Sequence, residues 1–531
     1  MLSRRTLLAS AAATPLLSYD ALADTPKDVI VMGMQIDDLI SLDPGEAFEF
    51  TGTEINGNVY QKLVIPDPTN PNVIKGELAE SWATSDDGLT TTFTLKTGMK
   101  FASGRPVTAE DAAFSLVRAV KLNKAPAFIV NQFGFTKDNV EERVRATGPN
   151  TLVLTVGEKV APTFLLYCLS ANVGSVVDKA TVMGHVENSD FGNGWMKTNS
   201  AGSGSWAVRS WKASENVILE PNPNAAVQPK LKRVILRHIP DPSSQLLQLQ
   251  KGDIDVARNL LSDQIKPLQT NAAYKISAAA RSYIMYMAMN QAVPALAKPQ
   301  VRQAIKWAVD YDAIQTNITP TNWQVQQSFL PQGFPGALND RPFRKDTAKA
   351  RALLVEAGYP NGFELTMDHA STQPIADIAQ AIQADLAAIG IKLTLLSGES
   401  RQVITKTRAR QHQMAIVSWG SDYFDPHSNA ETFNVNIDNT DAARSKTLAW
   451  RSSWQDKELS DLALANVREL DAKKRIAVYE TMQRMHHERS PFVMLLQSTE
   501  MAVMRKELAG FDVAPLYDRT VYTKAAKAAK A

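Results

Sequence analysis

The chain has 531 residues, of which 57 are lysine or arginine and 55 are aspartate or glutamate, so its formal net charge is only +2. This balance argues against nucleic acid or an anionic membrane surface as a partner. The chain is 44% hydrophobic and 21% charged, which is typical of a soluble globular protein, and no apolar run is long enough to span a bilayer. Its length predicts two or three lobes with separate cores.

Residues 1–23 predict a secretory signal peptide. The pair Arg4-Arg5 precedes a short apolar segment, and the small residues at 21–23 offer a cleavage site. The residues around the arginine pair also resemble a twin-arginine signal. Cys168 is the sole cysteine, so an intrachain disulfide and a lipid anchor after the signal are both excluded. We expect a periplasmic monomer in which Cys168 is a buried structural thiol.

The first elements after the signal are defined by local pattern. Residues Val29–Met34 predict a strand, Phe48 and Phe50 fall in a loop, and residues 54–63 predict a helix. The stretch 91–95 alternates as a half-buried strand should after the turn Ser-Asp-Asp-Gly. Thr108 and Asp111 then form a capping box, with Thr108 as the N-cap and Asp111 three residues later, and predict a helix through Val120.

The second half of the chain alternates helical and extended patterns. Amphipathic helices are predicted at 301–313, 348–356 and 375–389, and short strands at 364–367 and 391–395. This alternation favours α/β lobes. The apolar stretches 283–289 and 491–496 predict buried strands that cross between lobes, and the low-complexity end, 524–531, predicts a frayed tail.

The most informative stretch for binding is a strand at 414–419 that runs into a Gly-Ser-Asp turn. The turn brings Trp419, Asp422 and Tyr423 to one strand end, where loops commonly carry binding groups. A carboxylate beside two aromatic rings suits a ligand with a positively charged nitrogen. The alternative is an ordinary strand exit whose aspartate caps a turn. Asp425, just before Pro426, is expected to be such a turn residue.

A series of short motifs runs through the chain in a fixed order. The densest block is Leu-Ala-Glu-Ser-Trp at 78–82, Ser-Asp-Asp-Gly-Leu-Thr at 85–90 and Pro-Val-Thr-Ala-Glu-Asp at 106–111. Later motifs are Gly-Ser-Gly-Ser-Trp at 202–206, Gly-Asp-Ile-Asp at 252–255, Val-Arg-Gln-Ala at 301–304 and Ala-Gly-Tyr-Pro at 357–360. In this order they resemble the extracytoplasmic solute-binding proteins of family 5, which feed peptide and nickel ABC importers.

The resemblance implies an α/β fold of the type II periplasmic binding protein class, with two hinged lobes and an extra subdomain (cluster C-like). The first lobe is expected to be discontinuous, with residues 24–65, 200–285 and 497–531. The extra subdomain is expected at 66–199 and the second lobe at 286–496. The implied partners are a small-molecule or peptide ligand and the permease subunits of an ABC importer in the inner membrane; no cofactor and no catalysis are expected.

The resemblance also assigns roles at the site. Asp422 is expected to bind the ligand's α-ammonium, while Val417, Ser418 and Trp419 offer a strand edge and a wall. Tyr423 adds a second ring, and the opposing side is expected to supply Phe48, Phe50 and Trp206.

The sequence departs from the family where a ligand carboxylate would be bound. The loop 367–374 contains no arginine, and Ile416 stands where another branch has one. Arg401, Arg408 and Arg410 lie nearby in sequence but are interpreted as surface charge. A short peptide with a free carboxylate is therefore disfavoured, while longer peptides or amine-bearing compounds such as opines stay open.

Other functions stay open as alternatives. A nickel chelate held by His427 is one alternative, but His486 and His487 are adjacent on a helix and point apart, and no metal site is predicted. The turn 202–205 could suggest a hydrolase nucleophile, yet the chain has no Gly-x-Ser-x-Gly or His-Glu-x-x-His motif, so an enzyme is disfavoured. A chaperone or a sensor would share the same scaffold.

Overall fold

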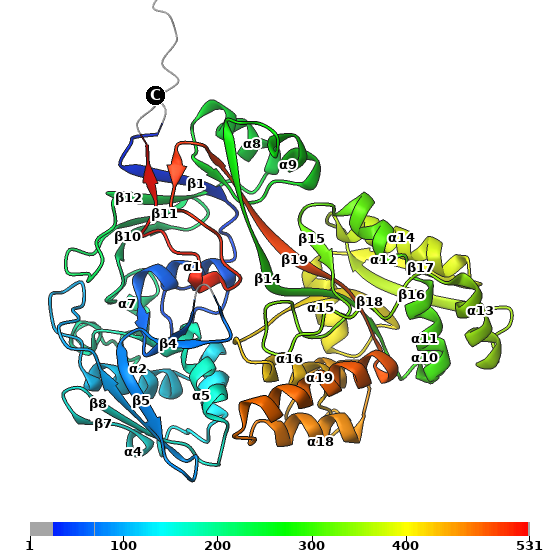
Figure 1. The fold of residues 1–531 in the computed structure, drawn as a ribbon, viewed down its shortest axis with the longest axis horizontal. Coiled ribbons are helices and arrows are strands. Elements are labelled where there is room, and N and C mark those ends of the chain that lie inside the picture. Colours follow the sequence, from blue (N-terminus) through cyan, green and yellow to red (C-terminus); the bar gives the residue numbers. More distant parts are fainter. Residues whose placement is uncertain (1–24, 68–69, 529–531) are drawn as a thin grey trace, which may run out of the picture.

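The computed structural model describes residues 25–67 and 70–528. The expected signal segment, 1–23, lies outside the described residues. Figure 1 shows the strands of the N-terminal third on one side and the helices of residues 290–490 on the other, with long strands running between them. In the described part of the chain, every helix is too short or too polar to cross a membrane.

The connection between the two sides is made by β14 (Tyr274–Met289) and β19 (Phe492–Arg505). These strands pair antiparallel from Tyr274↔Arg505 to Ala288↔Phe492, with an irregular register between Ala280 and Ile284. They join a continuous sheet in the order β10-β11-β12-β1-β13-β19-β14-β18-β16-β17, to which β15 (Trp323–Val325) adds on β19. The stretches 283–289 and 491–496 are thus parts of longer strands that cross between the two sides.

In the N-terminal lobe, β1 (Val29–Met34) has the predicted bounds and lies parallel to β12 (Arg233–His238). Its side chains enter a core with Trp206 and Leu236. Around it lie β10 (Trp206–Lys212), β11 (Asn216–Pro221), β13 (Val256–Ala257), α8 (Pro242–Lys251) and α9 (Ser262–Leu268).

The helix predicted at 54–63 is shifted in the structure. Helix α1 (Phe50–Val59) begins at Phe50, which is therefore not a loop residue, and ends before Tyr60, whose backbone is extended. The chain then forms β2 (Gln61–Lys62), which pairs with β9 (Ser175–Val176). The strand pairing ends the helix four residues earlier than the sequence pattern indicates.

The extra subdomain is built around a sheet in the order β5-β6-β8-β7. The capping box is confirmed: Asp111 N donates to Thr108 Oγ1, and Thr108 N donates to Asp111 Oδ2 at 3.0 Å. Helix α2 packs its apolar face into a core with Phe93, Leu116 and Leu152. The elements of this region are β3 (Val64–Pro66), β4 (Ile74–Gly76), β5 (Ala79–Thr84), β6 (Thr90–Leu95), α2 (Ala109–Leu122), α3 (Phe128–Asn131), α4 (Val140–Arg143), β7 (Val144–Gly148), β8 (Thr151–Thr155), α5 (Pro162–Leu169), α6 (Lys179–Met183) and α7 (Asn193–Met196).

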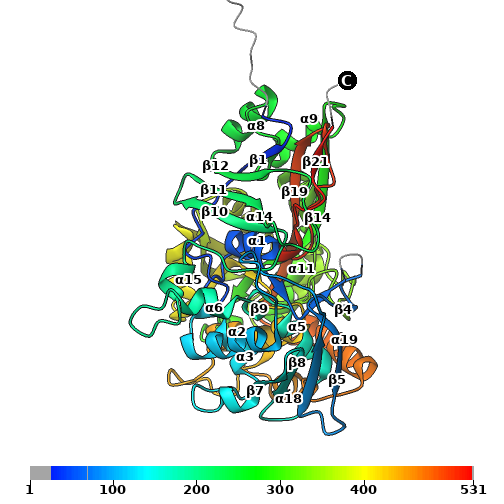
Figure 2. The ribbon, with the colours of Figure 1, turned by 90° about the vertical axis from the view of Figure 1, so that its left-hand side faces the viewer.

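Cys168 lies near the end of α5 and is fully buried, as predicted. Burial raises the pKa of its thiol well above the usual value, which keeps it in the unreactive thiol form. Figure 2 shows β5, β7 and β8 below the strands β10, β11 and β12 of the N-terminal lobe.

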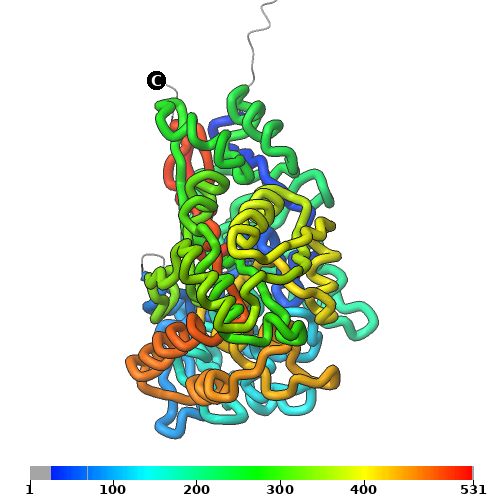
Figure 3. The backbone as a smooth tube through the Cα atoms, turned by 90° about the vertical axis from the view of Figure 1, so that its right-hand side faces the viewer, coloured from blue at the N-terminus to red at the C-terminus, as the bar shows by residue number. Residues whose placement is uncertain are grey.

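In the second lobe, β16 (Phe363–Ala370) lies parallel to both β17 (Ile391–Gly398) and β18 (Met414–Gly420). One core contains Met287, Ile305 and Leu386, and another contains Tyr286 and Phe433. Figure 3 shows the helices of this lobe along the right-hand face of Figure 1. They are α10 (Pro294–Ala297), α11 (Pro299–Ala308), α12 (Tyr311–Ala313), α13 (Thr347–Glu356), α14 (Ile375–Ala387), α15 (Ser400–Arg408), α16 (His427–Asn434), α17 (Leu448–Arg451), α18 (Lys457–Asn466) and α19 (Ala472–Arg489).

Two expectations from the sequence need correction here. The helix predicted at 301–313 is divided after Ala308, because Asp310 caps a new turn and accepts a hydrogen bond from Ala313 N at 3.0 Å. The predicted frayed tail is wrong up to Ala528, because β21 (Ala526–Lys527) pairs with β20 (Leu508–Ala509). The boundaries of the three units stay predictions.

Buried charges hold α1 against the crossing strands. Arg258 donates to Glu54 at 2.8 and 3.0 Å and to Glu500 of β19 at 2.6 and 2.9 Å. Arg281 of β14 lies 3.3 Å from Glu500 and 3.9 Å from the centre of the Tyr517 ring. These contacts tie the helix that begins with Phe50 to the strands that join the two sides.

Candidate functional site

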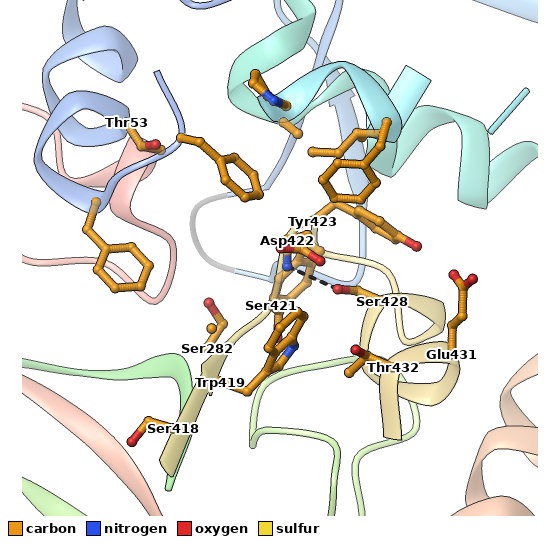
Figure 4. A pocket seen from close by; sticks show the side chains of 18 of the residues that line it. Thr53, Ser282, Ser418, Trp419, Ser421, Asp422, Tyr423, Ser428, Glu431 and Thr432 are labelled. Carbon is orange, nitrogen blue, oxygen red and sulfur yellow. Dashed lines mark hydrogen bonds between the residues drawn. The ribbon is translucent and has the colours of Figure 1, made fainter. Parts of the chain in front are cut away.

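A cavity of about 730 Å³ lies between the two sides of the molecule. The N-terminal side supplies Phe48, Phe50 and Thr53, and the extra subdomain adds the segments 126–129 and 170–173. The second lobe supplies the end of β18 with the loop that follows, the adjoining face of α16, the end of α15 and residues 445–451. Figure 4 shows part of this lining, with Trp419 on β18 and Ser428, Glu431 and Thr432 on α16.

The end of β18 presents a free strand edge. One side of β18 pairs with β14 along its whole length, but on the other side β16 reaches only Met414 and Ala415. From Ile416 onward, no strand of the described residues covers that edge. Val417, Ser418 and Trp419 line the cavity there, so their backbone groups are placed to pair with an extended ligand.

Asp422 lies in the loop after β18. Its backbone N–H donates to Ser428 Oγ at 3.0 Å, which fixes the loop against α16 (Figure 4). Its carboxylate lines the cavity and has no hydrogen bond or ion pair to any residue that the structure describes. Burial raises the pKa of Asp422 to about 7, and the negative charge of Glu431 adds to this effect, while the positive charge of Arg451 opposes it.

Glu431 is a second carboxylate at the cavity, and it was not among the site residues expected from the sequence. It lies on α16, where His427 Nε2 is 3.4 Å from Glu431 Oε2. Burial disfavours its charge, but the contact with His427 outweighs burial and lowers the pKa of Glu431. The i, i+4 spacing of His427 and Glu431 after Pro426 is a signal that could have pointed to this pair.

Asp425 is a turn residue, as predicted, and also a buried anchor. It accepts a hydrogen bond from His427 N at 2.9 Å and two from Arg475 at 2.6 Å each. Both partners of this ion pair are buried, with side-chain exposures of 0% for Asp425 and 5% for Arg475. The loop that carries Asp422 is therefore fixed to α19 by a bidentate contact.

Aromatic rings form the apolar wall. Phe48 and Phe50 are 36% and 40% exposed; the Phe48 ring packs edge-on against Phe128, and the Phe50 ring stacks on Tyr517 at 4.2 Å. Tyr423 lines the cavity, but only 5% of it is exposed. Phe128 and Tyr517 also line the cavity and were not predicted, because they come from sequence regions far from any motif.

Trp206 does not lie at the cavity. It begins β10, is 1% exposed and packs in the core of the N-terminal lobe. The preceding Gly202 and Gly204 lie against the end of α1, where a Cβ on Gly202 would meet Val59 O at 2.0 Å. The motif 202–206 is therefore a packing motif, which corrects the expected role of Trp206 as a ligand cover and leaves no exposed turn for a nucleophile.

Basic residues line another part of the cavity. Arg408 is exposed, as expected for a surface charge, and it also lies on the cavity lining, where Lys446 and Arg451 join it. Arg410 instead donates to Asn439, and Arg401 is exposed away from the cavity lining. Sequence motifs could not identify Arg451, because its position depends on how residues 435–451 fold back over β18.

The histidines do not gather into a metal site. His486 contacts Asn434 Oδ1 at 2.9 Å, and His487 contacts the Gln327 carbonyl at 2.9 Å. In the described ranges, no group of three His, Cys, Asp or Glu side chains is arranged to hold a metal ion. The nickel-chelate alternative gains no support from these contacts.

The chain is similar to periplasmic solute-binding proteins in each comparison with known proteins. Residues 73–441 match the model of the bacterial extracellular solute-binding proteins, family 5 (middle). The probable D,D-dipeptide-binding periplasmic protein of Escherichia coli is 28% identical over 94% of this chain and 94% of its own length. The di/tripeptide-binding protein 2 of Pseudomonas aeruginosa is 24% identical, covering 87% and 88%.

Among solved structures, a similar one is a periplasmic binding protein from Helicobacter pylori in complex with the peptide STSA. It is 24% identical, its TM-score is 0.76, and the match covers 94% of this chain and 98% of the other. At this identity the likeness shows the fold, which is that of the type II periplasmic binding proteins.

Proposed function

Since this chain belongs to the bacterial extracellular solute-binding proteins of family 5, it is a solute-binding component of an ABC importer, and we propose that it captures a peptide or related amine-bearing solute. The solute is held between the lobes and delivered, unaltered, to the permease in the inner membrane. The protein acts in the periplasm as a monomer and catalyses no reaction; the partner ATPase supplies the energy.

The observation that carries this proposal is the carboxylate of Asp422. It faces the cavity without a partner among the described residues, and burial, the main cause of its raised pKa, disfavours an unpaired charge there. A ligand ammonium group removes that penalty by forming a charge-assisted hydrogen bond. Exclusion of water strengthens the attraction, because the effective dielectric constant inside the cavity is low.

The rest of the site suits the same ligand. The free edge of β18 accepts an extended main chain, and the exposed rings of Phe48 and Phe50, with the partly buried Trp419, give apolar area to side chains. The lobes are joined by β14 and β19, whose register is irregular between Ala280 and Ile284. We place the hinge there, because paired strands can bend at an irregularity while the lobes stay rigid.

Asp422→Asn is expected to weaken binding of short peptides with a free amino terminus by about 1.5–3 kcal/mol, the contribution of a hydrogen bond to a charged group. Titration calorimetry with a mixed pool of di- and tripeptides measures this loss. Asp441→Asn, which removes a charge that is 95% exposed, is the matched control and should bind as the wild type does. Equal binding by both variants would eliminate the assignment of Asp422.

Affinity for the same peptides is expected to rise with pH from acid to near pH 8. Below the Asp422 pKa of about 7, a proton must leave the carboxylate before it pairs with the ammonium group, so binding weakens in acid. The slope should reach about tenfold per pH unit, and the rise should end near pH 8, where amino termini lose their proton. Titrations between pH 5.5 and 8 test this; a rise that persists in Asp422→Asn would contradict it.

A further inference from the structure

Three cations at the cavity have no anionic partner among the described residues. Arg408 and Lys446 are exposed at its edge and Arg451 is partly buried; none of the three forms an ion pair with a residue that the structure describes. Elsewhere, buried charges such as Arg118 and Arg475 are matched by bidentate carboxylates. A cavity that gathers unmatched cations beside its acids is suited to a ligand that brings its own anion.

Arg451 is the most constrained of these cations. It ends α17, is only partly exposed, and its Nε donates to the Lys446 carbonyl at 3.3 Å. This hydrogen bond engages one nitrogen of the guanidinium group, while its two terminal nitrogens have no hydrogen bond to a described residue. A planar fork with free donors matches a carboxylate in a bidentate geometry. Burial is also the main cause that lowers the pKa of Arg451 below its ordinary value.

Arg451 and Asp422 lie in each other's electric field without touching. Each shifts the pKa of the other in the direction expected for opposite charges, yet they form no ion pair. The cavity therefore has a negative and a positive group separated by a gap. A molecule with an ammonium group at one end and a carboxylate at the other can bridge that gap, whereas a simple amine leaves Arg451 unpaired.

We infer that Arg451, assisted by the nearby charges of Arg408 and Lys446, binds a carboxylate of the ligand, so that the solute is a compact zwitterion held at both ends. This inference rests on the proposed function, since it takes the amine at Asp422 as given. It reverses the expectation, drawn from the missing arginines in 367–374 and at 416, that a free carboxylate is disfavoured. The anion-binding group comes from a different segment.

The test uses di- and tripeptide pools in three forms: unmodified, amidated at the carboxyl end, and acetylated at the amino end. Each pool is mixed with wild-type protein, Arg451→Gln or Arg444→Gln, and the retained peptides are quantified by mass spectrometry after rapid desalting. The wild type should retain the unmodified pool about tenfold to a hundredfold better than the amidated pool. In Arg451→Gln the two pools should be retained equally.

Arg444→Gln is the matched control, because Arg444 is exposed, lies seven residues away and does not line the cavity. It should keep the wild-type preference. The comparison of the pools on the wild type does not require any variant to fold. Arg451→Lys keeps the positive charge but loses the two-pronged guanidinium group, so it should restore part of the preference for unmodified over amidated peptides.

The outcomes separate the two claims. Equal retention of the unmodified and amidated pools by the wild type overturns the role of Arg451 and leaves the amine at Asp422 standing. Equal retention of the unmodified and acetylated pools overturns the amine assignment instead. Retention of none of the pools overturns the peptide class and the inference with it.

Discussion

Arg475→Met is expected to lower the free energy of unfolding by about 3–5 kcal/mol, because it leaves Asp425 buried and charged without its partner. Asp425 is 0% exposed and receives both terminal nitrogens of Arg475 at 2.6 Å. Arg475 also donates to the Asn466 carbonyl at 3.2 Å and lies over the Phe164 ring. The substitution thus loosens the contact between α19, the loop of Asp422 and the extra subdomain.

Urea unfolding followed by circular dichroism measures this loss. Arg484→Met is the matched control on the same helix, since Arg484 is 56% exposed and should change stability by less than about 0.5 kcal/mol. Replacing the acid as well, in Asp425→Asn with Arg475→Met, should recover part of the loss because no unpaired charge remains. A loss in Arg475→Met no larger than in the control would show that the pair is not an anchor.

Arg258→Met should have an effect of similar size, about 3–5 kcal/mol at neutral pH, because it leaves two buried acids with less compensation. Arg258 donates to Glu54 and to Glu500, and after its removal Arg281 remains 3.3 Å from Glu500 and 4.0 Å from Glu54. Since Glu54 is on α1 and Glu500 on β19, the change should also weaken peptide binding by displacing Phe50.

The pH dependence of this loss has a defined sign. Burial opposes the charge of Glu500, but Arg281 and Arg258 outweigh it and hold the pKa of Glu500 at about 2. In the wild type, the stability from Glu500 is therefore present above its ordinary pKa, about 4.3, and is lost as pH falls toward 2. Without Arg258, Glu500 has one cation fewer to favour its charged form, so protonation of Glu500 removes part of the loss and the difference between the two proteins should shrink from pH 7 to pH 4.

Unfolding midpoints across that range test the linkage. Arg233→Met serves as the control, because Arg233 pairs with Glu220 at the surface and is 47% exposed. Its effect should be small and should vary little with pH. A loss in Arg258→Met that stays constant from pH 7 to pH 4 would contradict the claim that Arg258 holds Glu500 in its charged form.

Local chemistry explains what the sequence could predict. The capping box of Thr108 and Asp111, the strand β1 and the turn after β18 each depend on residues within a few positions of one another. Their interactions can therefore be identified without knowledge of the fold. Asp425 as a turn residue belongs to the same class, because its hydrogen bond to His427 N spans two residues.

Long-range contacts explain what the sequence missed. Arg475 meets Asp425 across 50 residues. Trp206 is buried because its core also takes in side chains from distant segments, such as Ile30 and Tyr522. The first half of β14, which includes Ala278, has no strong strand pattern and is extended because β19 pairs with it. In each case the deciding partner is set by tertiary structure.

The site shows the same division. Asp422 and Trp419 follow from the turn chemistry after β18, whereas Glu431 and Arg451 reach the cavity through α16 and α17. The sequence motifs indicate where an amine could bind. They place the expected carboxylate-binding arginine in the loop 367–374 or at 416, whereas the cavity has Arg451 instead. Only the folded arrangement places Arg451 near Asp422.

The central claim is tested most directly by native mass spectrometry of the protein purified gently from the periplasm, with wild type and Asp422→Asn compared. The account predicts that the wild type carries a small solute with a free amino group and that Asp422→Asn, although folded, carries much less of it. The same solute at equal occupancy on both proteins, or a bound solute that lacks an amino group, would contradict the account.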